Sequence, residues 1–165
     1  MTMQSTPWLD QLVADGLVQP PTVPNAATRD ALMAAAKTSL ADATRDPDRS
    51  PGGIIRDVEN AVRQAINALA AHHGTRITDP NKHLSVVRFA GAHPGFDDAT
   101  TRRIDQIRVA RNAGMYGDRH DDSPAEYSPQ DAALLLDAGT NVVNRVSSLV
   151  NARRPIPPPP SLGGN

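Results

Sequence analysis

Residues 54–69 read IIRDVENAVRQAINAL and carry the clearest structural signal in this chain of 165 residues. Apolar side chains recur along the stretch at intervals of three and four, as the spacing of Ile55, Val58, Ala61, Val62, Ala65, Ile66 and Leu69 shows. This is the period of an α-helix that buries one face. The pattern ends at Gly74, and glycine suits the left-handed position that follows many helices. The stretch therefore predicts the central helix of a helical core.

Other segments show the same period. The spacing predicts helices over residues 26–45, 80–91, 98–118 and 129–152, and a short one over residues 7–16. Good helix starts precede three of them: Asn25, Asp79-Pro80 and Ser128-Pro129. Segments 46–53 and 119–127 have the composition of loops. No stretch alternates apolar and polar residues long enough to form a sheet, so the sequence predicts an all-α bundle of four or five main helices.

Proline divides the chain into three predicted parts. Residues 1–24 form an N-terminal arm with a short helix and a Pro-rich connector, residues 25–152 form the bundle, and residues 153–165 form a disordered Pro-rich tail. Trp8 is the single tryptophan and lies on the arm. We expect it either to hold the arm against the core or to anchor a binding partner.

The composition excludes several classes of function. Apolar residues make up 39% of the chain, many of them alanine, and only five residues are aromatic. A core of this kind buries little area per residue, which favours a partner or a homodimer. The net charge of −1 provides no global field that would attract nucleic acid. Without cysteine the chain has no disulfide or thiolate chemistry. We see no export signal and no membrane-spanning run, and we expect a cytoplasmic protein.

The histidines show no metal-binding pattern. His72, His73, His83, His93 and His120 include no pair at the spacing of a helical zinc site. Structural or surface roles are the favoured interpretation, and we expect neither a metal nor a cofactor.

One polar stretch interrupts an otherwise amphipathic helix. Residues 104–118 read IDQIRVARNAGMYGD, in which Arg111, Asn112 and Tyr116 stand where a packed helix favours apolar residues. Arg111 and Asp118 are seven positions apart and therefore share one helical face. Two interpretations stay open here: a fraying helix end with a surface arginine, or a functional cleft.

The order Arg-Asn-x3-Tyr-x-Asp on the penultimate helix of a small α bundle resembles the HEPN superfamily. Its nuclease members carry an Arg-x4–6-His motif, which takes the form Arg-x4-Tyr-x-His in toxins paired with minimal nucleotidyltransferases. Arg111, Asn112 and Tyr116 match that form, whereas Asp118 stands in the place of the histidine. The tryptophan motif near the N-terminus and the later LADA segment, residues 40–43, resemble a bacterial subgroup of small HEPN proteins.

The resemblance implies a bacterial toxin–antitoxin module with a nucleotidyltransferase-fold toxin as partner. HEPN nucleases are metal-independent RNases whose arginine and histidine act on the scissile phosphate across a dimer interface. A carboxylate at Asp118 is ionised at pH 7 and repels phosphate. His120, nine positions after Arg111, is the nearest substitute histidine but points to the opposite side of a continued helix.

Three functional hypotheses follow. The first is a non-catalytic antitoxin that neutralises its partner through Trp8, Arg111 and Tyr116. The second is a HEPN ribonuclease toxin, acting on RNA with Arg111 and either Asp118 or His120. The third is a homodimeric structural bundle in which Arg111 belongs to a buried polar network.

Overall fold

The computed structural model describes residues 6–78, 82–115 and 127–152, and this part of the chain is all-helical. Its six helices are α1 (Pro7–Ala14), α2 (Ala26–Arg45), α3 (Pro51–His72), α4 (Lys82–Ala92), α5 (Asp98–Met115) and α6 (Pro129–Asn151). The predicted all-α class is confirmed. The five longer helices and the short α1 also agree with the predicted bundle and arm.

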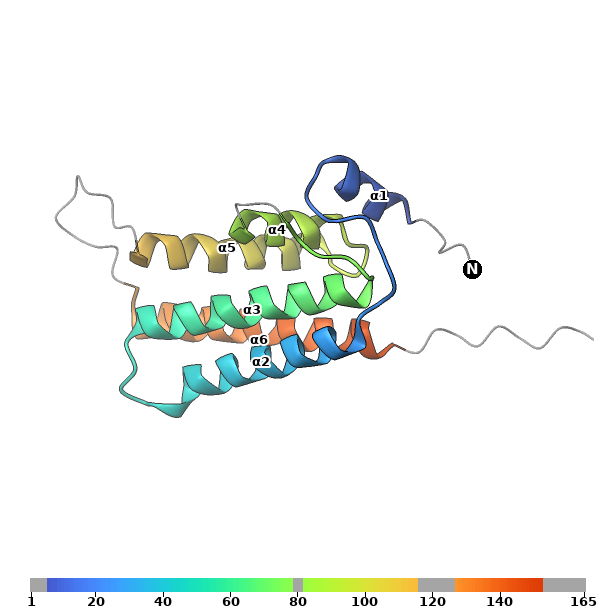
Figure 1. Cartoon of the computed structure of the whole chain (residues 1–165). Coiled ribbons are helices and arrows are strands. Elements are labelled where there is room, and N and C mark those ends of the chain that lie inside the picture. The colour runs from blue at the N-terminus through green and yellow to red at the C-terminus, as the bar shows by residue number, and fades with distance from the viewer. Residues whose placement is uncertain (1–5, 79–81, 116–126, 153–165) are drawn as a thin grey trace, which may run out of the picture.

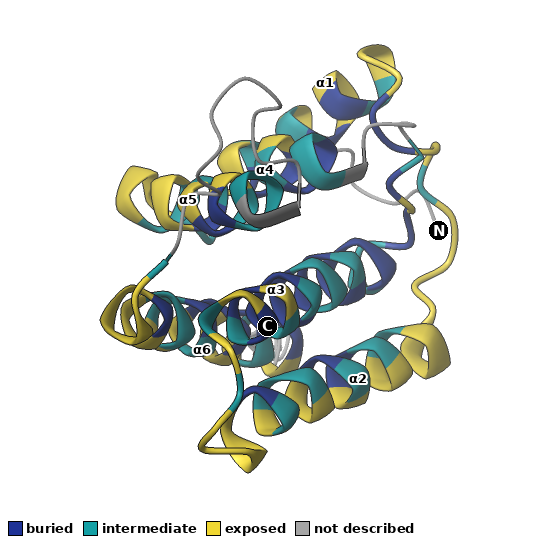
Figure 2. Ribbon diagram, turned by 90° about the vertical axis from the view of Figure 1, so that its left-hand side faces the viewer, coloured by how far each residue is buried: buried dark blue, intermediate teal, exposed yellow. Residues whose placement is uncertain are grey.

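Helix α3 lies at the centre of the bundle, as the sequence predicts. It contacts α2, α4, α5 and α6, and Figure 1 shows α2 on one side of it and α4 and α5 on the other. Figure 2 shows that the buried parts of the helices face inward, toward α3. Most of the core side chains are alanine, valine, leucine and isoleucine, and Phe89 is the largest fully buried one.

The start of α3 corrects one prediction. The loop predicted over residues 46–53 ends at Ser50, and α3 begins at Pro51. The Ser50 hydroxyl caps the helix by accepting a hydrogen bond from the Gly53 N–H (3.1 Å). Serine followed by proline is a strong helix start, and the two glycines that suggest a loop fit into the first helical turn.

Capping at the starts of α2 and α6 follows the sequence closely. The Asn25 side chain accepts from the Thr28 N–H at the start of α2. Ser128 and Asp131 form a reciprocal capping box at the start of α6. The predicted start at Asp79-Pro80 lies outside the described residues, as does the part of the 98–118 helix beyond Met115. The tail, residues 153–165, lies outside them too, so its disorder stays a prediction.

The N-terminal arm returns alongside the segment that follows α3. The Gln19 N–H donates to the Arg76 carbonyl, and the Thr78 N–H donates to the Leu17 carbonyl. Gly74 has a φ of +72°, and a Cβ there would lie 2.1 Å from the Thr22 carbonyl oxygen. Only glycine fits this close approach. The arm is thereby attached to the end of α3.

None of the helices in the described ranges combines the length and the apolar character that a bilayer crossing requires.

Candidate functional site

A polar cluster connects three helices near the first half of α3. It consists of Glu59 on α3, His83 on α4 and Arg111 on α5. His83 Nδ1 lies 2.5 Å from Glu59 Oε1, and Arg111 Nη1 lies 3.0 Å from His83 Nε2. Arg111 Nε and Glu59 Oε2 are 3.3 Å apart and form an ion pair. We call these three residues the Glu–His–Arg cluster.

The arginine determines which nitrogen of His83 carries the proton. A guanidinium only donates hydrogen bonds, so Nε2 of His83 must accept the bond from Arg111 Nη1. Nδ1 then carries the hydrogen and donates it to Glu59 Oε1. Each ring nitrogen has one defined role, and the imidazole is held between a carboxylate and a guanidinium.

Glu59 is the most buried residue of the cluster and His83 the most exposed. The exposed fractions of the side chains are 6% for Glu59, 18% for Arg111 and 33% for His83. A carboxylate this far from water needs a cationic or hydrogen-bonding partner. Arg111 and His83 supply both, so the cluster joins α3, α4 and α5 through charge in addition to apolar contact.

Helical register explains how a charged residue enters the core at two of these positions. Glu59 follows Ile55 by four positions and precedes Val62 by three, which places it on the buried face of α3. Arg111 follows the buried Ile107 by four positions in the same way. The two charged side chains therefore point into the same interhelical space.

The structure accounts for only part of the predicted site. Arg111 lies in the cluster, and Asn112 beside it is half-buried. Tyr116, Asp118 and His120 lie outside the described residues, so their predicted roles are untested. Glu59 and His83 were absent from the predicted site. A carboxylate inside the most regular apolar stripe was the signal that could have identified Glu59.

A second cluster lies at the other end of α3 and includes Trp8. Its indole ring packs edge-on against His73, Phe89 and His93, with centroid distances of 5.2, 5.7 and 4.9 Å. This confirms the prediction that Trp8 holds the arm against the core; a further role in partner binding stays a prediction. We call Trp8, His73 and His93, with Phe89 below them, the aromatic cluster.

The two histidines of the aromatic cluster share a hydrogen bond. His93 Nδ1 accepts from the Gly95 N–H at 2.9 Å, so a neutral His93 carries its hydrogen on Nε2. That nitrogen lies 3.0 Å from His73 Nε2, which therefore acts as the acceptor. Burial, together with the nearby His73, His72 and Arg145, lowers the pKa of His93 to about 4. The favoured state of His93 is thus uncharged.

Neither cluster has the composition of a metal centre. Over residues 6–78, 82–115 and 127–152, no three or more His, Asp or Glu side chains gather in a way that could hold a metal ion.

A groove between α5 and α6 exposes apolar side chains. Its cavity measures about 440 Å³. The lining residues are Asp105, Gln106, Val109, Ala110, Tyr127, Asp131, Leu134 and Leu135. Val109 and Leu134 are among the exposed large apolar residues of the chain, and Leu134 is 64% exposed. We call this surface the α5–α6 groove.

Comparison with known proteins adds no relative. The sequence matches no protein-family model, and neither a curated protein nor a solved structure is detectably similar to it.

Proposed function

We propose that this chain is a non-catalytic, HEPN-like antitoxin of a bacterial toxin–antitoxin module that binds and neutralises a nucleotidyltransferase-fold toxin. The observation that carries the proposal is that the Arg111 guanidinium already has partners inside the bundle. The guanidinium of the residue that matches the HEPN motif is held by Glu59 and His83 inside the bundle. The order of the sequence motifs along the chain supports the choice of family.

A ribonuclease arginine must direct free N–H groups at a phosphoryl oxygen where negative charge develops. In this chain Nη1 of Arg111 donates to His83, and Nε lies beside the Glu59 carboxylate. That carboxylate neutralises the guanidinium and repels a phosphate. The arrangement favours a stabilising role for Arg111 over a catalytic one.

The α5–α6 groove is a suitable surface for a protein partner. Large exposed apolar side chains in one place commonly mark a binding surface. Asp105 and Asp131 flank Val109 and Leu134 in this groove. Asp105 is paired with Arg108 and Asp131 with the Ser128 cap, so the apolar lining is what favours a partner, one that presents a large apolar side chain.

Paired expression in a bacterial host tests the proposal. We expect this chain to be harmless alone and to restore growth when its neighbouring gene product is toxic. Leu134→Asp should weaken the complex and the rescue by at least about tenfold, because it places a charge in the centre of an apolar contact. Val23→Asp is the matched control, since Val23 is also exposed but lies outside the groove. Equal effects of the two variants would refute the groove as the interface.

A second candidate function is that of a metal-independent ribonuclease. The specific observation in its favour is a partly exposed histidine, His83, next to Arg111. Nε2 of His83 is unprotonated, its ring is one-third exposed, and it lies 3.0 Å from Arg111 Nη1. In this candidate Arg111 turns from His83 to the RNA phosphate, which frees Nε2 of the Glu59-oriented ring to accept a proton from an RNA hydroxyl. This candidate replaces the histidine that the motif lacks at position 118 with one from another helix.

The same host separates the candidates. Growth arrest by this chain alone, abolished by His83→Gln in a folded protein, would establish the ribonuclease and refute the antitoxin. A chain that neither arrests nor rescues growth would leave the structural bundle, the third hypothesis. In that case Arg111→Ala changes stability and nothing else.

A further inference from the structure

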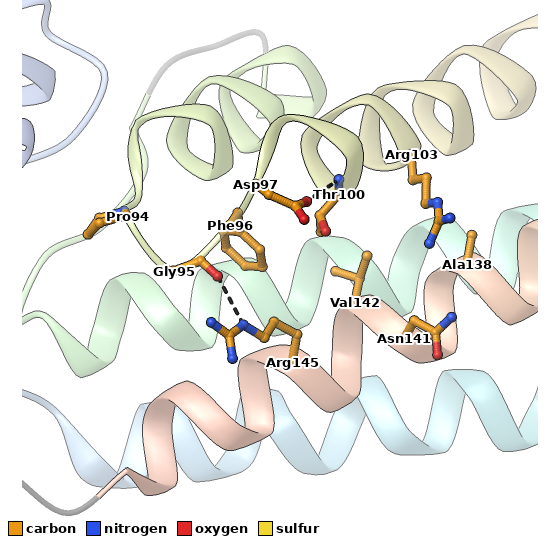
Figure 3. Close-up of a pocket in the computed structure, with 10 residues that line it drawn as sticks. All are labelled: Pro94, Gly95, Phe96, Asp97, Thr100, Arg103, Ala138, Asn141, Val142 and Arg145. Atoms are coloured by element: carbon orange, nitrogen blue, oxygen red, sulfur yellow. Dashed lines mark hydrogen bonds between the residues drawn. The ribbon is translucent and has the colours of Figure 1, made fainter.

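A second cavity opens at the other end of the α5–α6 face, next to His93 of the aromatic cluster. Its volume is about 410 Å³. One wall is the turn before α5 together with the first turns of that helix, and the other is a face of α6. Figure 3 shows the ten lining residues: Pro94, Gly95, Phe96, Asp97, Thr100, Arg103, Ala138, Asn141, Val142 and Arg145. The α6 residues recur at intervals of three and four and so form one continuous face.

Two arginines from different helices line this cavity, and neither forms an ion pair with a carboxylate of the described part of the chain. Arg145 Nε donates to the Gly95 carbonyl at 2.9 Å, which holds the side chain across the cavity, as Figure 3 shows. Its two terminal nitrogens are not used by that bond. Among the residues that the structure describes, no ion pair within 4.0 Å involves Arg103 or Arg145. The cavity therefore holds two guanidinium groups with donors available to a ligand.

Asp97 is the single carboxylate of the cavity wall, and its oxygens already have partners. Its Oδ1 accepts from the Thr100 N–H at 2.7 Å, which caps the start of α5. Hydrogen bonds from the side chain and the backbone of Thr100 lower the pKa of Asp97, and the charge of Arg103 lowers it further. One carboxylate against two arginines leaves this site with a net positive charge.

The rest of the lining is suited to an uncharged group attached to an anion. Phe96, Ala138 and Val142 supply apolar surface, and Asn141 supplies an amide beside it. The volume falls within the usual range for small-molecule sites. Guanidinium groups bind both phosphate and carboxylate oxygens in a forked geometry, and a phosphate monoester, with a charge of about −1.5 to −2 at pH 7, matches two guanidinium groups better than a single carboxylate does.

From these features we propose that the cavity binds a phosphate monoester, with the exposed side chains of Arg103 and Arg145 closing on the phosphate from the two ends of the cavity and the organic group over Phe96 and Val142. The proposal concerns a site distinct from the Glu–His–Arg cluster. It is independent of the antitoxin function, because binding is measured on this chain alone.

Calorimetry with phenyl phosphate and with inorganic phosphate, at a constant ionic strength of about 0.1 M, tests the proposal. We expect saturable binding of phenyl phosphate, tighter than that of inorganic phosphate, and amide NMR shifts confined to residues 94–103 and 138–145. Arg103→Gln and Arg145→Gln should each weaken binding by about tenfold or more, since each removes a charge-assisted contact. Arg145→Lys should fall between wild type and Arg145→Gln.

Arg102→Gln is the matched control, because Arg102 is exposed on the same helix but lines no part of this cavity. We expect less than about a twofold effect from it. If Arg102→Gln and Arg103→Gln weaken binding equally, the ligand is attracted only by the general positive charge, and the proposal is overturned. Absence of saturable binding up to about 10 mM phenyl phosphate, or equal affinity for the two phosphates, would overturn it as well. Circular dichroism of each variant verifies that the fold is kept.

Discussion

The two halves of α3 each pack against a histidine, and the two histidines have opposite electrostatic surroundings. At Glu59, near the start of the helix, His83 lies between a carboxylate and a guanidinium. At His73, fourteen residues and about 20 Å further along, His93 faces another histidine and the ring of Trp8. The first end is held by charge, and the second by apolar contact and a neutral hydrogen bond.

This difference shows that the neighbouring groups determine the protonation and the hydrogen bonds of a histidine inside the fold. A histidine between opposite charges has both ring nitrogens assigned and connects elements of the fold. A histidine among rings loses its tendency to take up a proton, because the charged form is poorly solvated there. The two ends of α3 should therefore respond differently to substitution and to pH.

The largest effect is expected from removal of the buried carboxylate. Glu59→Gln leaves Arg111 buried without a counter-charge, and such a loss typically costs about 3–5 kcal/mol of folding free energy. Urea unfolding at pH 7.5, followed by circular dichroism, measures it. Asp30→Asn is the control: it removes the surface Arg29–Asp30 pair and should leave the stability almost unchanged, because solvent screens such a pair.

A double variant sharpens the same test. The double variant Glu59→Gln/Arg111→Met should lose less stability than the two single variants lose together, by about 1–3 kcal/mol. In the double variant neither charge is left buried without its partner. Additive effects would mean that the two side chains do not interact in solution, contrary to their 3.3 Å separation.

A smaller effect is expected at the aromatic end, and it depends on pH. The pKa of His93 is lowered to about 4 in the folded protein, while the unfolded chain keeps a value of about 6.5. Below pH 6.5 the unfolded state binds more protons, so the stability from this residue is complete above pH 6.5 and decreases as the pH falls to about 4. We expect a loss of about 2–3 kcal/mol over this window.

His93→Gln isolates that contribution, since glutamine does not titrate in this range. Unfolding free energies of both proteins at several pH values between 8 and 4 give the difference curve. We expect the curve to be flat above pH 7 and to change between pH 6.5 and 4. A difference that does not vary with pH would contradict the buried, neutral state of His93.

The smallest effect is expected from the arm. Trp8→Ala removes a half-buried ring that contacts His73, Phe89 and His93, and we expect a loss of about 1–2 kcal/mol, below the cost for a fully buried aromatic residue. Trp8 is also the only tryptophan, so its fluorescence reports on this end of α3. In the wild type the fluorescence and circular dichroism transitions should coincide, and an earlier fluorescence transition would show that the arm unfolds separately.

Sequence alone determined the helical elements of this protein, because the period of apolar residues and the capping residues act over a few neighbouring positions. The central role of residues 54–69, the Asn25 cap and the Ser128 cap are all local features of this kind. The boundary at Ser50 was missed because glycines at positions 52 and 53 suit a loop as well as a first helical turn.

Only the tertiary structure decided which polar residues meet. Glu59, His83 and Arg111 are separated by 24 and 28 positions, and no periodicity relates residues on three different helices. The same holds for Arg103 and Arg145, which line one cavity from α5 and α6. Helix formation follows from short-range spacing, whereas the charge and the proton position of a buried group depend on what the packing of distant segments places beside it.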